Sequence, residues 1–150
     1  MKYIIIFITY LIFIGYNNLS LAIDIQIRAK VKNEIITNID IKHEIKYLIF
    51  LNPKLKELKE SKIEEIAKNS LITEMIKRME LEKIYDFNES SKIINVLEAN
   101  FFKRKKINDK EEFLNILKSK GMKYEKIRNK LQLEGLWNQF IYKQYFNNVK

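Results

Sequence analysis

Few side chains in this 150-residue sequence are suited to acid–base or metal chemistry. The sequence contains one histidine, His43, and no cysteine, so it lacks the usual ligand set of a zinc site. Its three glycines are isolated from one another and form no phosphate-binding loop. His43 lies beside the apolar stripe of the helix expected around it, which favours a solvated side chain over a catalytic base. We therefore predict no metal site and no cofactor.

Two pairs of adjacent carboxylates are the remaining candidates for paired acid–base catalysis. They are Glu64 with Glu65 and Glu111 with Glu112. Neighbouring positions on a helix do not face each other, and acidic residues near a helix start are explained by the helix dipole. The sequence thus indicates no catalytic residue, and it predicts that the chain is not an enzyme.

Basic and aromatic residues favour a binding function over catalysis. The net charge of +9 favours acidic partners. The densest basic run, 103–106, indicates a cationic helix end, with contact to nucleic acid, lipid headgroups or an acidic polypeptide as the alternative. Aromatic residues gather in the last third, and an adjacent pair on a helix is not expected to point inward with both rings. The candidate contacts to an extended, apolar polypeptide are Phe101, Phe102, Tyr124 and Trp137.

The first 22 residues indicate where such binding would take place. Lys2 precedes an uncharged apolar run from Tyr3 to Tyr16, and Ser20-Leu21-Ala22 places small residues where a signal peptidase reads them. The run is shorter than the roughly 20 residues that cross a bilayer. We predict a signal peptide over 1–22, cleaved between Ala22 and Ile23, and one periplasmic domain over 23–150. An uncleaved membrane anchor is the alternative, and export makes nucleic acid the weakest of the acidic partners.

The remaining sequence predicts a mainly α domain that opens with a short β-ribbon. Residues 25–32 alternate apolar and polar side chains, as in a half-buried strand. Asn33-Glu34 is the expected turn, and 35–36 the returning strand. Thr37-x-x-Asp40 is a capping-box pattern that starts the first helix, and Pro53 ends it.

Four further helices are expected. Ser61-x-x-Glu64 predicts the start of the second, which should run to about residue 85. The third should cover about 88–105, and Asp109 and Gly121 should bound the fourth. The fifth begins near residue 123 and contains Gly135, where the helix should bend or another backbone should pack closely.

Three stretches of this sequence, in this order, carry a resemblance to a known family. They are RAKVKNEIITNID at 28–40, LITE at 71–74, and KGMKYEKIR with LQLEGLW at 120–128 and 131–137. Together they resemble the N-terminal domain of the SurA-type periplasmic chaperones, over residues 25–150.

The resemblance implies a helical module that binds unfolded polypeptides, in particular outer-membrane β-barrel precursors, and prevents their aggregation. A second copy of the chain is a further expected partner, since the segment that packs on this domain in the family is missing here. In the family, parvulin-type isomerase domains follow, and none can be assigned to residues 23–150. One alternative is therefore the N-terminal part of a peptidyl-prolyl isomerase whose catalytic domain lies beyond Lys150. Another is a scaffold that its uncleaved leader holds on the membrane.

Overall fold

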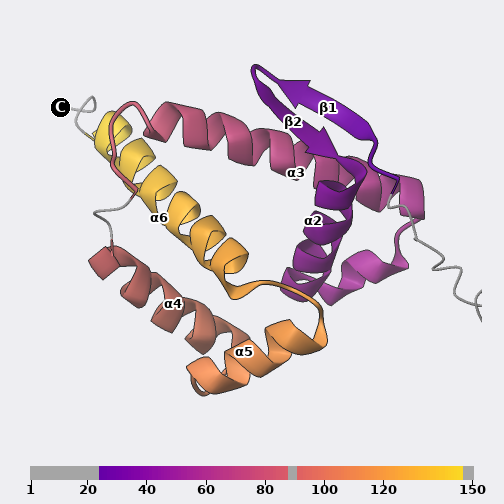
Figure 1. Cartoon of the computed structure of the whole chain (residues 1–150). Coiled ribbons are helices and arrows are strands. Elements are labelled where there is room, and N and C mark those ends of the chain that lie inside the picture. The colour runs from indigo at the N-terminus through magenta and orange to yellow at the C-terminus, as the bar shows by residue number, and fades with distance from the viewer. Residues whose placement is uncertain (1–23, 88–90, 147–150) are drawn as a thin grey trace, which may run out of the picture.

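A computed structural model of the chain describes residues 24–87 and 91–146. Within these ranges an antiparallel hairpin is followed by five α-helices, which confirms the expected mainly α class with a β-ribbon (Figure 1). The predicted leader, with its cleavage point between Ala22 and Ile23, lies outside the described residues. The elements are β1 (Ile27–Val31), β2 (Glu34–Thr37), α2 (Asn38–Leu51), the 3-10 helix η1 (Pro53–Glu57), α3 (Glu60–Leu81), α4 (Ser91–Lys105), α5 (Lys110–Ser119) and α6 (Tyr124–Phe146).

The ribbon turns one residue earlier than the sequence predicts. Val31 of β1 lies opposite Glu34 of β2, so the two-residue turn is Lys32-Asn33 rather than Asn33-Glu34. Lys32 supplies the positive φ, 53°, that this tight turn requires. The strand register is irregular between residues 27 and 29, and Ile27 is 66% exposed. The predicted apolar face of the first strand is therefore covered only towards its end.

The start of α2 follows the predicted capping box. The Thr37 hydroxyl accepts from the Asp40 amide at 3.2 Å, and the Asp40 carboxylate accepts from the Thr37 amide at 2.9 Å. Ile36 before the cap and Ile41 after it are both buried in one cluster with Ala67 of α3. Local sequence chemistry thus fixes where the ribbon ends and how α2 enters the core.

The predicted cap of α3 at Ser61 is wrong. The helix begins at Glu60 with Lys59 as the N-cap residue, and no side chain caps it. It ends at Leu81 rather than near Tyr85. Ser61 lies inside the first turn, where an exposed helix start can be satisfied by water instead of a side chain.

The ends of α4 and α5 share one geometry. Gly121, at φ 61°, follows α5 as predicted, and the Met122 amide donates to the Leu117 carbonyl at 2.9 Å. After α4, Lys106 takes the same left-handed conformation at φ 56°, and the Ile107 amide donates to Phe102 at 3.0 Å. Both helix ends are Schellman motifs. At the end of α4, however, the left-handed residue is a lysine, for which this conformation is sterically unfavourable.

Helix α6 lies between α3 and α4 in Figure 1 and packs against both. The hydrophobic core around these helices is divided into three clusters, which are centred on Ile36 at the ribbon, Phe113 at α5, and Leu133 on α6. Gly135 allows the close approach of α4, because a Cβ there would lie 3.3 Å from Leu97 Cγ and closer still to Leu97 Cδ1. The nearest atoms at Gly135 thus belong to a side chain, whereas the sequence predicts either a bend of the helix or the close approach of another backbone.

Candidate functional site

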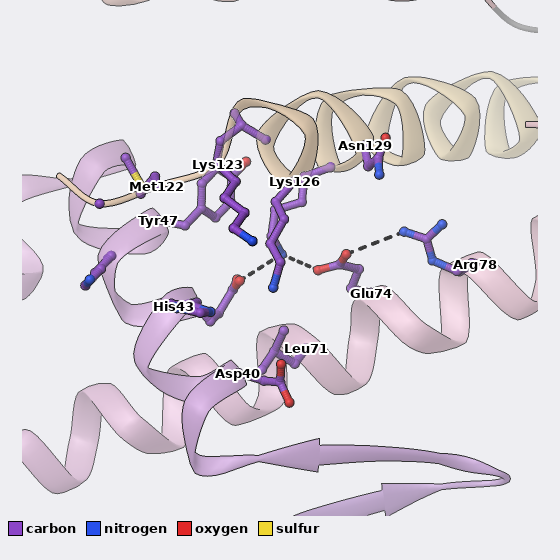
Figure 2. A pocket seen from close by; sticks show the side chains of 15 residues that line it. Asp40, His43, Tyr47, Leu71, Glu74, Arg78, Met122, Lys123, Lys126 and Asn129 are labelled. Carbon is purple, nitrogen blue, oxygen red and sulfur yellow. Dashed lines mark hydrogen bonds and ion pairs between the residues drawn. The ribbon is translucent and has the colours of Figure 1, made fainter. Parts of the chain in front are cut away.

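A buried ionic network joins α2, α3 and α6 where the three helices meet. The Glu44 side chain is only 1% exposed, and its two oxygens accept from Lys130 Nζ at 2.7 Å and from the Ser70 hydroxyl at 2.8 Å. Lys130 also pairs with Glu74, which lies 3.7 Å from Arg78. Figure 2 shows this chain of contacts running from α2 across to Arg78 on α3. The network ties the long helix α6 to the α2–α3 pair.

Sequence reasoning missed Glu44. Helical spacing predicts an apolar stripe of Ile41, Ile45, Leu48 and Ile49 on α2. Ile41 is buried and Ile45 and Leu48 pack on its cluster, but the other fully buried position is Glu44. Residues three apart share one helix face, so the signal was a carboxylate three positions after a buried isoleucine. Its partner Lys130 lies 86 positions further along the chain, and no local pattern predicts that pairing.

A pocket of about 250 Å³ lies beside this network, between α2 and the first turns of α6. Its apolar part comes from Tyr47, Leu71, Met122 and Ile127. Charged side chains surround this part, and Figure 2 shows Lys123 and Lys126 reaching from the α6 side towards α2. The complete set of charged lining residues is Asp40, Glu44, Lys46, Glu74, Arg78, Lys123, Lys126 and Lys130.

His43 stands on the α2 side of this pocket as an exposed side chain, in line with its predicted place at a solvated rim. Partial burial lowers its pKa below 6.5, and the ammonium groups of Lys126 and Lys46 lower it further. The imidazole is therefore uncharged at neutral pH.

Two other titratable groups in the pocket are fixed in one protonation state at neutral pH. Burial acts to raise the pKa of Asp40, but hydrogen bonds from Thr37 and the charge of Lys126 outweigh it, so this pKa is lowered. Burial, followed by the charge of Glu44, raises the pKa of the Tyr47 phenol well above its usual value. Asp40 stays ionised and Tyr47 stays protonated, which suits fixed recognition more than proton transfer.

The structure places three of the four predicted client contacts around one internal ring. Phe101 is 3% exposed, and both Phe101 and Phe102 pack on Phe113, at ring distances of 5.7 and 4.9 Å. Of this adjacent pair, Phe101 is buried, whereas Phe102 stays partly exposed and meets Phe113 of α5, so the two rings are not both buried in the core. Tyr124 meets the same ring at 6.2 Å, and its hydroxyl donates to Glu98 at 2.5 Å.

The fourth predicted contact, Trp137, belongs to a different cluster. It is half-buried beside Phe140, at a ring distance of 5.5 Å, and Lys77 lies over its indole at 5.7 Å. The structure thus brings Phe101, Phe102 and Tyr124 together and leaves Trp137 apart. Because Phe101 is buried among these rings, little of its surface is accessible to a partner.

Among the described residues, the most exposed aromatic group lies at the end of α6 and consists of Tyr142, Tyr145 and Phe146. These side chains are 61, 68 and 63% exposed. The rings of Tyr142 and Phe146 stack at 4.8 Å. Positions 142, 145 and 146 share one helix face, and we call this strip the α6 aromatic end. These residues belong to the aromatic-rich last third of the sequence, but none of them is among the four predicted contacts.

The basic run 103–106 has a structural role in part. Lys105 donates to the carbonyl oxygen of Leu51, the last residue of α2, at 2.6 Å. It also lies over the Phe50 ring at 5.7 Å. A cation at a helix C-terminus complements the dipole there, so Lys105 ties the end of α2 to α4. Lys103, Arg104 and Lys106 remain exposed.

Within residues 24–87 and 91–146, no group of three His, Asp or Glu side chains is placed to hold a metal ion. None of the helices in this described part is long and apolar enough to cross a membrane. A comparison of the chain with protein-family models, curated proteins and solved structures finds no match.

Proposed function

We propose that this chain is a non-enzymatic chaperone module of the SurA type, which binds unfolded polypeptides in the periplasm and keeps them from aggregating. The observation that carries the proposal is the α6 aromatic end. Three large aromatic side chains, each more than 60% exposed, form one strip on a helix. Soluble proteins seldom leave such apolar surface uncovered unless it contacts a partner.

The surroundings of the strip suit an extended polypeptide. The half-buried rings of Trp137 and Phe140 lie earlier on α6 and pack in the cluster of Leu81, Leu133 and Leu136. Lys143 lies over the Tyr85 ring at 5.7 Å, which brings the end of α3 alongside. Ile84, next to Tyr85, adds a further apolar side chain that is 57% exposed. Aromatic groups beside a cation bind apolar and acidic stretches without demanding one sequence.

The net charge supports the same class of client. A charge of +9 attracts acidic polypeptides and raises the rate of encounter at low salt. The order of segments that resembles the SurA-type chaperones supports a periplasmic location and outer-membrane β-barrel precursors as clients. The proposed contact surface differs from the four residues chosen from sequence, since Phe101 and its neighbours pack around Phe113.

Suppression of aggregation tests this function. The purified chain is mixed with a denatured outer-membrane β-barrel protein during dilution, and light scattering follows its aggregation. We expect the wild-type chain to suppress scattering and the triple variant Tyr142→Ala/Tyr145→Ala/Phe146→Ala to lose most of that effect. Alanine is the best helix former, so α6 is retained.

A matched control removes exposed apolar surface elsewhere. Val96 on α4 is 61% exposed, and Val96→Ala should suppress scattering as the wild type does. Circular dichroism checks that all variants are folded. A wild-type chain without effect on scattering would refute the function, and a triple variant with full effect would refute the surface.

A further inference from the structure

The pocket between α2 and α6 has more positive than negative charge on its lining. Five cationic side chains and three carboxylates line it. The carboxylates are engaged, because Glu44 and Glu74 bind Lys130 and Asp40 binds the Thr37 amide. Among the ion pairs of the described residues, none involves the three pocket lysines Lys46, Lys123 and Lys126.

These three lysines act on the same place in the pocket. Lys46 of α2, Lys126 of α6 and Lys123, which directly precedes α6, line this pocket together with His43. The charge of each lysine acts to lower the pKa of that imidazole. Figure 2 shows Lys126 of α6 and Lys123 just before it reaching towards α2, the helix that carries His43 and Asp40. The carboxylate of Asp40 offsets part of this charge, and the remaining excess of positive charge attracts an anion.

The rest of the lining requires the anion to carry an apolar part. Leu71, Met122 and Ile127 form the apolar part of the pocket, with the protonated Tyr47 beside them. A cavity of about 150 Å³ holds benzene, so the volume of about 250 Å³ here admits a ligand of the size of a six-carbon carboxylic acid.

We propose that this pocket binds a monocarboxylate with a short apolar tail. The carboxylate lies between Lys123 and Lys126, and the tail lies on Leu71, Met122 and Ile127. The site goes beyond the proposed chaperone function, because it uses no residue of the α6 aromatic end. The same chemistry has two sources, a free carboxylic acid or the terminal carboxylate of a polypeptide that ends in an apolar residue.

The probe is hexanoate, and the signal is the ring proton resonances of His43, which is the only histidine in the chain. We expect saturable shifts with a Kd of about 1 mM, and a rise of the His43 pKa when the bound carboxylate offsets the lysine charges. Acetate lacks the tail and should bind at least about tenfold more weakly. Equal binding of hexylamine, or no saturable shift with hexanoate at roughly ten times that Kd, would overturn the proposal.

A charge-matched pair of variants locates the site. Lys123→Gln/Lys126→Gln should weaken hexanoate binding by about tenfold or more. The control Lys54→Gln/Lys56→Gln removes the same charge from exposed positions of η1 and should bind as the wild type does. Both lysines of the test pair are exposed, so the fold should persist, and circular dichroism checks it. Unchanged affinity in the test variant would refute the site.

Two further ligands separate the sources. N-acetyl-leucine has a terminal carboxylate on an apolar residue, and N-acetyl-leucinamide has the same body without the charge. Binding of the acid and not of the amide supports a polypeptide terminus as ligand, and binding of hexanoate without N-acetyl-leucine supports a free acid. An amide that binds as tightly as the acid would overturn the need for a carboxylate.

Discussion

Replacement of Lys130 by methionine should lower the free energy of unfolding by about 3–5 kcal/mol. Methionine fills a similar volume, so the change removes mainly the charge and its hydrogen bonds. Glu44 is then left with one partner, the Ser70 hydroxyl at 2.8 Å, in a place where its side chain is 1% exposed. Burial removes the hydration of this carboxylate, and without the lysine no opposite charge compensates for that loss.

Urea unfolding followed by circular dichroism at the helix band measures this loss. For a domain of this size, 3–5 kcal/mol corresponds to a fall of about 10–20 °C in Tm. The double variant Glu44→Gln/Lys130→Met should recover most of the loss, because a neutral amide replaces the uncompensated charge. Recovery in the double variant separates the electrostatic cause from lost packing of the lysine stem.

The matched control breaks an ion pair on the surface. Lys62 and Glu65 pair at 2.9 Å with both side chains more than half exposed, and Lys62→Met should not shift the midpoint measurably. A Lys130→Met variant that stays within about 1 kcal/mol of the wild type would show that this network does not hold the three helices together.

Three further predictions follow from single positions. Gly135→Ala should destabilise the fold by about 1 kcal/mol, because overlap with Leu97 outweighs the gain in helix propensity. In a Leu97→Ala background the same substitution should be stabilising. Urea titrations of the wild type, the two single variants and the double variant measure both changes in stability. Lys106→Gly should raise the free energy of unfolding by about 0.5–1 kcal/mol, because glycine adopts the left-handed conformation without steric cost. Lys106→Ala should give no such increase, and the same urea titrations measure both variants. The NMR titration of His43 should give a pKa below 6.5, and Lys126→Gln should raise it. Because the pKa of His43 is lower in the folded chain than in the unfolded chain, the unfolded chain binds a proton at higher pH. The folded state therefore loses stability as pH falls through 6.5, and His43→Gln should remove this part of the pH dependence.

Local patterns predicted most of the helix boundaries. Thr37 and Asp40 form the expected capping box, Asp109 accepts from the Glu112 amide at 2.8 Å, and Gly121 closes α5. These signals work because each joins groups within one turn of the chain. The prediction at Ser61 failed because water can satisfy an exposed helix start without a side-chain cap, and the helix begins two residues earlier than a cap at Ser61 would place it.

The side-chain environment was harder to predict from the sequence. Periodicity placed Phe101 on an inward face, but it could not say that Phe102 would also pack on Phe113. It also treated Ile27 as part of a covered face, although this residue is 66% exposed beyond the register irregularity. The partial burial of Phe102 and the exposure of Ile27 both depend on which helix or strand packs against the residue, and this is decided by the tertiary structure.

The sequence by itself determined the ribbon, the order of the helices, their capped ends and the excess of positive charge, because each depends on near neighbours or on composition. The tertiary structure decided how distant residues meet. It brought Lys130 to Glu44, gathered lysines from α2 and α6 around His43, and left the α6 aromatic end exposed. These contacts join residues far apart in the chain, and only helix packing, which sets their separation and their burial, could produce them.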